Sequence, residues 1–126
     1  MKIAVIGTGY VGLVSGVCFS ELGFKVACID NDASKVAELQ KGNALIYEPG
    51  LDKLMQKNVQ AGRLEFIASV DGCIENADIV FIAVGTPSKS DGSADLSYVY
   101  AAVSDISLCI NKNAVLVIKS TVPVGT

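Results

Sequence analysis

Short apolar blocks alternate along the chain with segments in which apolar residues recur at helical spacing. The blocks are rich in valine and isoleucine and lack an alternation of polar and apolar positions, which is the pattern of strands buried on both faces. The longest block runs from Ile79 to Val84. We predict strands over residues 2–6, 25–30, 64–68, 79–84 and 114–119.

Between these strands, helical spacing and glycine stop signals predict five helices, over residues 10–22, 33–40, 49–62, 70–76 and 96–110. Asn31 or Asp32 can cap the second helix, and Asp95 can cap the last one. The apolar face of the first helix is predicted from its helical repeat, which comprises Val11, Val14, Val17, Cys18 and Leu22.

Strands and helices alternate five times, so the sequence predicts an α/β fold with a mostly parallel sheet covered on both faces. Because crossovers between parallel strands are right-handed, we expect a doubly wound, Rossmann-like sheet with the strand order 3-2-1-4-5. The length of 126 residues fits one domain.

Composition and charge exclude several classes of function. Hydrophobic residues make up 51% of the chain and charged residues 18%, which excludes a disordered protein. A net charge of −3 without runs of lysine or arginine offers no field that would hold nucleic acid or an acidic membrane. Glycines interrupt the N-terminal apolar stretch well short of a membrane span, so we expect neither a targeting signal nor a membrane anchor.

The chain has four cysteines and no histidine. The cysteines are widely separated, which leaves no ligand set for zinc and no Cys-His or Ser-His nucleophile, so we expect neither a metal site nor a catalytic residue. Buried, reduced thiols in a cytoplasmic protein are the expected state. Cys18 and Cys28 are predicted to face the core, where a thiol is inert.

Three glycines follow the first predicted strand directly and open the first predicted helix, in the order Gly7-Thr8-Gly9-Tyr10-Val11-Gly12. This is the G-x-G-x-x-G pattern. Gly7 would permit the tight turn, Gly9 would let a diphosphate approach the backbone, and Gly12 would let the helix lie close to the sheet. The free N–H groups and the dipole at the helix start favour an anion. The sequence therefore predicts a dinucleotide-binding loop.

A dinucleotide-binding loop of this kind is followed by an acid about 20 residues further on. Asp30 fits this pattern, since it ends the second strand 18 residues after Gly12. A carboxylate accepts hydrogen bonds from the ribose hydroxyls but repels a 2′-phosphate by about 4 kcal/mol at 4 Å and an effective dielectric near 20. Because Asn31 and Asp32 follow rather than arginine, we predict NAD and not NADP as the cofactor. A simple helix cap is the alternative role for Asp30.

Further candidates lie near the same edge of the sheet. Lys35, on the first turn of the second helix, could reach the adenosine end of the cofactor, although a solvated helix lysine is the ordinary alternative. Ligands of open α/β sheets bind beyond the carboxyl ends of the strands, where the strand order reverses. Gly85, Thr86 and Pro87 follow the fourth strand, and Ser120 and Thr121 follow the fifth. The hydroxyls of Thr86, Ser120 and Thr121 could bind the ribose and nicotinamide half of NAD.

Five ordered segments carry a specific resemblance: "MKIAVIGTGYVGLVSG", "CIDND", "YEPGL", "VGTPSKSDGSADLSYV" and "KSTVPVGT". Together they resemble the N-terminal, NAD-binding part of the UDP-glucose 6-dehydrogenases, in the nucleotide-sugar dehydrogenase family. The resemblance spans the whole chain. It implies that NAD contacts fall on the Gly7–Gly12 loop, which contains Thr8, Tyr10 and Val11, on Asp30 and Lys35, and on Thr86 and Thr121, while Gly85 is a cofactor-binding candidate from its place at the sheet edge. It also implies that Thr121 lies near the reacting carbon and helps to position water.

The activity that the resemblance implies is oxidation of UDP-glucose to UDP-glucuronate with two NAD. Family members are much longer, and their catalytic cysteine, catalytic lysine, central helix and UDP-sugar domain lie beyond the equivalent of Thr126. We therefore expect residues 1–126 to be the NAD-binding domain of a longer enzyme, with its sheet truncated before completion. That domain would be inactive alone and homodimeric in the full-length enzyme, whose partner is a UDP-sugar.

Two other functions stay open at this stage. GDP-mannose or UDP-N-acetylhexosamine could be the substrate, since "GTPSK" resembles the GDP-mannose enzymes as well. A non-enzymatic nucleotide-sensing module would carry the same glycine loop and strand-end acid, but it would not explain "EPGL", "VGTP" and "STVPVGT". The resemblance gives Glu48 and "DGSADL" no firm role.

Overall fold

The computed structural model describes residues 1–72 and 74–126. Within them the strands are β1 (Lys2–Ile6), β2 (Lys25–Ile29), β3 (Leu64–Ile67), β4 (Ile79–Ile82) and β5 (Val115–Ile118), and the helices are α1 (Tyr10–Glu21), α2 (Ala33–Gln40), α3 (Leu51–Gln60) and α4 (Ser97–Ser107). Every predicted strand is present, and its ends differ from the prediction by at most two residues.

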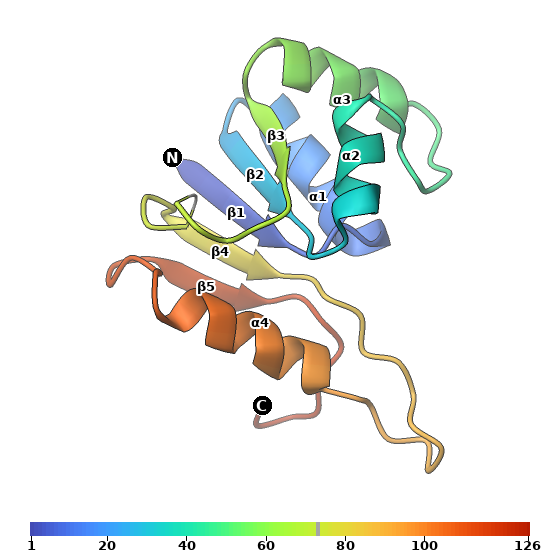
Figure 1. The fold of residues 1–126 in the computed structure, drawn as a ribbon, viewed down its shortest axis with the longest axis vertical. Helices are drawn as coiled ribbons and strands as arrows, with labels where there is room; N and C mark the ends of the chain where they lie inside the picture. Colours follow the sequence, from blue (N-terminus) through green and yellow to red (C-terminus); the bar gives the residue numbers. More distant parts are fainter. Residues whose placement is uncertain (73) are drawn as a thin grey trace.

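The strands form one sheet in the order β3-β2-β1-β4-β5, and every neighbouring pair is parallel (Figure 1). Ile3 of β1 is in register with Val26 of β2 on one side and with Ile79 of β4 on the other. The predicted fold class and strand order are thus confirmed. The order reverses between β1 and β4, so a ligand is expected beyond the carboxyl ends of these two strands.

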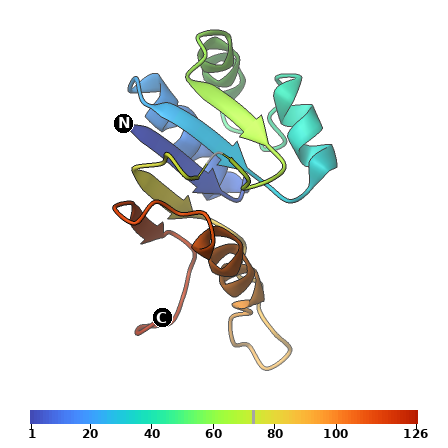
Figure 2. The same cartoon turned by 60° about the vertical axis from the view of Figure 1, so that its left-hand side comes forward.

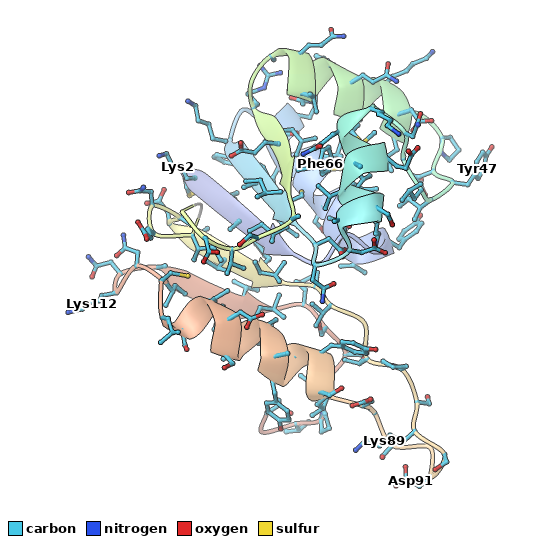
Figure 3. All side chains as sticks on the ribbon, in the orientation of Figure 1. Lys2, Tyr47, Phe66, Lys89, Asp91 and Lys112 are labelled. Carbon is cyan, nitrogen blue, oxygen red and sulfur yellow. The ribbon has the colours of Figure 1, made fainter. Side chains whose placement is uncertain are left out.

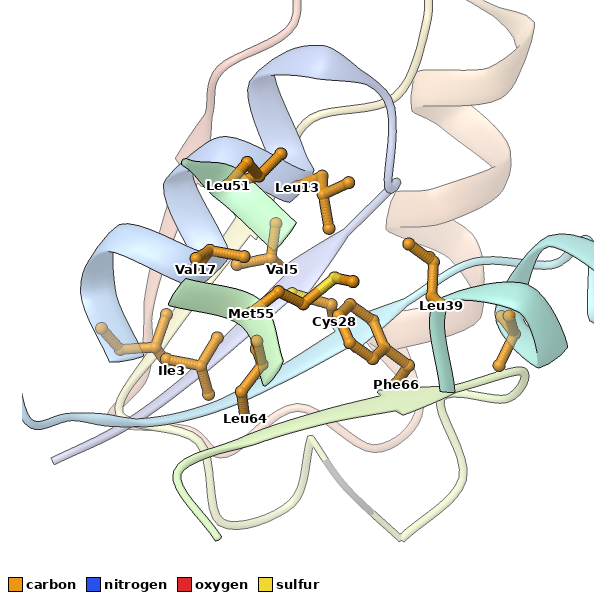
Figure 4. Packing of buried hydrophobic residues seen from close by; sticks show 12 residues of the cluster. Ile3, Val5, Leu13, Val17, Cys28, Leu39, Leu51, Met55, Leu64 and Phe66 are labelled. Carbon is orange, nitrogen blue, oxygen red and sulfur yellow. The ribbon is translucent and has the colours of Figure 1, made fainter. Parts of the chain in front are cut away.

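Helices cover both faces of the sheet, as Figures 1 and 2 show from two directions. Strand side chains alternate between the faces: Ile3 and Val5 belong to one buried cluster, while Ala4 and Ile6 belong to the other. The first cluster lies under α1, α2 and α3, and Figure 4 shows Met55 of α3 over Val5 and Cys28 of the sheet. The second cluster joins the opposite face to α4 through Ala102 and Ile106.

The buried face of α1 differs from the predicted one. It comprises Gly12, Leu13, Gly16, Val17 and Ser20, so of the predicted stripe only Val17 is buried. Small residues bring the helix close to the sheet, because a Cβ on Gly16 would lie 2.4 Å from the Cys28 Sγ. Val14 is partly buried against the same cluster, so the valine repeat indicated only one edge of the buried face, because glycine and serine carry no apolar signal.

The thiols correct a second prediction. Cys28 is buried, and burial raises its pKa to about 12, which keeps the thiol protonated and unreactive. Cys18 is exposed on the outer side of α1, and Cys109 is half-buried, so the expectation of buried thiols holds for Cys28 alone among these three. All three are free. Cys73 lies outside the described residues.

The helix predicted over residues 70–76 is absent from its described residues, which form turns and bends. Gly72 has a φ of +77°, a left-handed conformation that interrupts a helix. The Ser69 hydroxyl donates to Asp71 and accepts from its backbone N–H, so a local side-chain turn replaces the first helical bonds. Ile74 from this segment and Ala77, directly after it, still cover the sheet as part of the second buried cluster.

Two acids begin helices near their predicted places. Asp32 caps α2, because its carboxylate accepts hydrogen bonds from the Ser34 and Lys35 backbone N–H groups. Asp95 accepts from the Ser97 N–H, although the cap position of α4 itself is Leu96. The segment before α4 projects from the body as a narrow loop with Lys89 and Asp91 near its tip (Figure 3). An antiparallel bridge between Ser88 and Ala94 closes it.

Candidate dinucleotide-binding site

Packing fixes two of the three glycines of the loop between β1 and α1. Gly7 has a φ of +97°, and a Cβ there would lie 2.7 Å from the Ala83 carbonyl oxygen of the neighbouring strand end. A Cβ on Gly12 would lie 1.8 Å from the Gly7 carbonyl oxygen. Neither position can hold a side chain without moving backbone, so α1 is held close against the loop and the sheet.

Gly9 is the exception, because a Cβ there would meet nothing within 4 Å. The missing side chain therefore serves no contact within the protein and leaves space for a ligand. Gly9 also caps α1, which begins without a side-chain cap and without an acid in its first turn. The N–H groups and the positive end of the helix dipole at this point are suited to a diphosphate.

Asp30 lies at the end of β2 and is tied to the same loop. Its Oδ2 accepts from the Thr8 N–H at 2.9 Å and from the Thr8 hydroxyl at 2.6 Å, while its Oδ1 accepts from the Asp32 N–H at 3.1 Å. Thr8 is 1% exposed, and its buried hydroxyl holds the Asp30 carboxylate in place. Of the two carboxylate oxygens, Oδ1 has the fewer donors and is the better placed to accept from a ribose hydroxyl.

Two opposing effects act on the pKa of Asp30. Partial burial would raise the pKa, but the hydrogen bonds from the Thr8 side chain and backbone, from the Asp32 N–H and from Lys35 outweigh it. The net pKa is lowered, which keeps the carboxylate ionised at neutral pH. An ionised acid accepts hydrogen bonds from a ribose diol and repels a phosphate.

Lys35 lies beside this acid, with its Nζ 3.2 Å from the Asp30 Oδ2. The side chain is 27% exposed and that of Asp30 is 12% exposed. Both residues line one cleft of about 780 Å³ together with Gly7, Thr8 and Gly9. The fold thus brings together the glycine loop, the strand-end acid and the helix lysine that the sequence identified separately.

The far end of this cleft is formed by residues that the sequence did not identify. They include Ser69, Val70 and Asp71 from the turn after β3, Tyr98, Ala101, Ala102, Ser104 and Asp105 from α4, and Leu108 at the end of that helix. Tyr98, Ala101, Asp105 and Leu108 lie on one side of the helix and its C-terminal cap, since they follow at spacings of three and four. That spacing was readable, but only the fold shows that these residues line the same cleft as Asp30.

Two other loop residues extend away from the cleft. Tyr10 is exposed, and its hydroxyl donates a hydrogen bond to the Glu48 carboxylate, which lies in the connection between α2 and α3. This hydrogen bond and the negative charge of Glu48 raise the pKa of Tyr10. Val11 is exposed as well, so neither side chain belongs to the core. The backbone N–H groups of Tyr10 and Val11, in the first turn of α1, are what these residues can offer an anion.

A second group lies beyond β4 and β5. The hydroxyls of Thr86 and Thr121 are 2.5 Å apart, although 35 positions separate these residues in the chain. The Ser120 hydroxyl donates to the Val84 carbonyl at 2.7 Å and fastens the two strand ends together. Gly85 lines the cleft, whereas Pro87 is exposed beyond it. Pairing of β4 with β5 therefore unites the two threonines that the sequence placed on different strands.

No group of three or more histidine, cysteine, aspartate or glutamate side chains within residues 1–72 and 74–126 is arranged to hold a metal ion. Across the same ranges, no helix has the length and apolar character that a membrane crossing requires.

Comparisons with known proteins agree with this geometry. The family model described as "UDP-glucose/GDP-mannose dehydrogenase family, NAD binding domain" matches residues 1–126. A UDP-glucose 6-dehydrogenase from Rhizobium meliloti is 55% identical over 127 residues, a match that covers 100% of this chain and 29% of the relative. A UDP-glucose 6-dehydrogenase from Pseudomonas aeruginosa is 48% identical over 126 residues and is covered to 28%.

Solved structures show the same likeness. A ternary complex of GDP-mannose dehydrogenase from Pseudomonas aeruginosa superimposes with a TM-score of 0.94 at 36% identity, covering 100% of this chain and 30% of that one. A UDP-glucose dehydrogenase from Pyrobaculum islandicum gives 0.92 at 43% identity, covering 99% and 30%. The chain thus spans less than a third of the length of these relatives. It belongs to the UDP-glucose/GDP-mannose dehydrogenase family and matches the NAD-binding domain of that family.

Proposed function

We propose that the chain is the NAD-binding part of a UDP-glucose 6-dehydrogenase, an enzyme that oxidises UDP-glucose to UDP-glucuronate with two NAD. One observation carries the placement of NAD: Gly9 leaves open space at the uncapped start of α1, in the same cleft as the ionised Asp30. The high identity to relatives named UDP-glucose 6-dehydrogenase supports the choice of enzyme.

In this proposal, different residues of the cleft bind different parts of NAD. The N–H groups of Gly9, Tyr10, Val11 and Gly12 receive the diphosphate, helped by the dipole of α1. Asp30 accepts from the adenosine ribose through its Oδ1, the oxygen with the fewer donors. The far end of the cleft, between the turn after β3 and α4, takes the adenine ring.

The nicotinamide half would extend to the strand ends of β4 and β5, where Thr86 and Thr121 present their hydroxyls side by side. When bound there, NAD would supply the acceptor for a hydride from the carbon of the substrate alcohol. The residues of this chain then bind and orient the cofactor, and Thr121 lies on the side of the reacting carbon. We assign no catalytic nucleophile or base to these residues, so the chain alone should bind NAD without oxidising sugar.

Calorimetric titration of the full chain with NAD, NADP and UDP-glucose tests this proposal. We expect saturable binding of NAD, much weaker binding of NADP and no formation of NADH from UDP-glucose. The variant Asp30→Ala should lose NAD binding, whereas Asp91→Ala, at the tip of the projecting loop, should retain it. Absence of NAD binding, or equal affinity for NAD in Asp30→Ala, would contradict the proposal.

GDP-mannose oxidation is a second candidate, because the GDP-mannose dehydrogenase from Pseudomonas aeruginosa matches this fold with a TM-score of 0.94. The higher identity to the UDP-glucose enzymes favours UDP-glucose. Formation of NADH by the full-length enzyme with each nucleotide sugar in turn distinguishes the two. Faster turnover of GDP-mannose would replace our first choice.

Compartment and assembly belong to the same proposal. Cys18, Cys28 and Cys109 are free thiols, which supports a reducing compartment such as the cytoplasm. We further propose that the full-length enzyme is a homodimer, which light scattering on that enzyme would test.

A further inference from the structure

Strand β5 is far less buried than its composition predicts. Its four residues, Val115 to Ile118, are as apolar as the buried strands, yet Val115 is 57% exposed, and Leu116 and Ile118 are exposed as well. A strand of a parallel sheet is normally covered on both faces. The described residues therefore leave an apolar strand partly uncovered at the edge of the sheet.

The two valines of β5 lie on the same side of the sheet as α1. Val117 is in register with Phe81 of β4, which packs against the cluster under α1, α2 and α3. The ring of Phe81 stacks on that of Phe19 in α1, with centroids 5.1 Å apart. Figure 1 shows the three helices of this side gathered around β1, β2 and β3, with β5 beyond them. We call Phe19, Phe81, Val115 and Val117 the valine face.

The handedness of crossovers decides which side of β5 a continuing chain can cover. The connection from β4 to β5 places α4 on the side of the second buried cluster. Crossovers between parallel strands are right-handed in about 98% of cases, so a helix leading from β5 to a further strand would lie on that side too. It would cover Leu116 and Ile118 but not Val115 and Val117. The valine face needs a different cover.

We propose that the valine face is a docking surface for a later part of the same polypeptide, beyond the crossover that follows β5. Relatives have the necessary length, since this chain covers 29% of the UDP-glucose 6-dehydrogenase from Rhizobium meliloti. The face has no charged side chain, so the docking segment presents apolar side chains of its own, and their burial drives the contact. The inference rests on the proposed function, which makes the chain part of a longer enzyme.

Docking at this face acts on the nicotinamide end of the candidate site. Thr121 lies three residues after the end of β5, and its hydroxyl is 2.5 Å from that of Thr86. Within the described sheet, β5 is an edge strand that pairs with β4 alone. A segment packed on the valine face holds β5, and with it Thr121, in place. Turnover should therefore depend on this contact, whereas NAD binding at the glycine loop should not.

Thiol labelling of Val115→Cys tests the cover directly. In the 126-residue chain, a maleimide should modify this cysteine as it modifies the exposed Cys18, while the buried Cys28 stays unmodified. In the full-length enzyme, Val115→Cys should lose its labelling, as read by peptide mass mapping. A photo-crosslinker on this cysteine should join it to a peptide that follows the crossover in the same polypeptide. Equal labelling in the chain and the enzyme overturns the inference.

Charged substitutions test the consequence for activity. In the full-length enzyme, Val115→Lys should lower the melting temperature and reduce turnover. Leu45→Lys is the matched control, because Leu45 is 50% exposed in the connection between α2 and α3 and should tolerate the charge. In the 126-residue chain, neither variant should lose NAD affinity. Equal losses in both full-length variants, or no loss in Val115→Lys, overturn the inference.

A second copy of the chain is the other possible occupant of the valine face. If light scattering shows a dimer of the 126-residue chain that Val115→Lys dissociates, or if the cross-link joins two protomers, the inference is overturned. Protection of Val115→Cys in the full-length enzyme, together with failure of the native chain to bind NAD, counts against the proposed function and leaves the docking surface in place. NAD binding without protection has the opposite meaning.

Discussion

The two halves of the carboxyl edge of the sheet are built in different ways. Around β1 and β2, Gly7 and Gly12 lie against backbone atoms, and Thr8 donates two hydrogen bonds to the partly buried carboxylate of Asp30. Around β4 and β5, Gly85 has no neighbour near its Cβ position, and two hydroxyls at the surface make the contact between Thr86 and Thr121. In the proposed complex, the half that would hold adenosine is thus fixed by close backbone packing and partly buried hydrogen bonds, and the half that would hold nicotinamide by hydroxyl hydrogen bonds. Substitutions should therefore cost most on the adenosine side.

The largest effect is expected for Gly12→Ala. Its Cβ would lie 1.8 Å from the Gly7 carbonyl oxygen, so α1 or the loop must move. Overpacking against backbone should lower the free energy of unfolding by about 3 kcal/mol and abolish NAD binding. Denaturant unfolding and calorimetry measure the two effects. A stable variant that binds NAD normally would show that the loop yields easily.

Gly9→Ala should separate binding from stability. A Cβ at this position meets nothing in the protein and Gly9 has a φ of −70°, so the free energy of unfolding should fall by at most about 1 kcal/mol. NAD affinity should fall about tenfold or more, because the methyl group enters the space assigned to the diphosphate. Native affinity in this variant would contradict that assignment.

Thr8→Val should act through Asp30. Hydrogen bonds from Thr8 help to lower the pKa of this acid, so they stabilise the fold at neutral pH, and that stability is lost as the pH falls through the lowered pKa. Without the hydroxyl the pKa of Asp30 rises, and acid unfolding should begin at a higher pH. Circular dichroism against pH measures the shift, and Thr8→Ser, which keeps the hydroxyl, should restore the native profile.

The smallest effect is expected on the nicotinamide side. Thr86→Val or Thr121→Val removes one hydrogen bond between neutral hydroxyls, so the free energy of unfolding should change by less than about 1 kcal/mol. In the full-length enzyme each variant should weaken NAD binding modestly, and Thr121→Val should also slow turnover. A loss of stability as large as that of Gly12→Ala would erase the contrast between the two halves.

Local patterns in the sequence were sufficient for much of this architecture. Buried strands read as short apolar blocks because both faces of a parallel sheet are covered, and the glycine loop followed by Asp30 is a local signal with fixed spacing. The pattern failed where burial depends on close approach rather than on apolar side chains. Gly16 and Ser20 face the sheet while Cys18 does not, and the turn around Gly72 replaced an expected helix.

The sequence by itself determined the order of strands and helices, the glycine loop and the acid that follows it. Only the tertiary structure decided that Thr86 meets Thr121, that a face of α4 closes the far end of the cleft, and that Lys35 with Thr8 surrounds Asp30. The reason is physical. A periodic pattern indicates which side of each segment is buried and which is exposed to water. Contacts between segments distant in the chain depend instead on which strands pair and on how closely each helix packs on them.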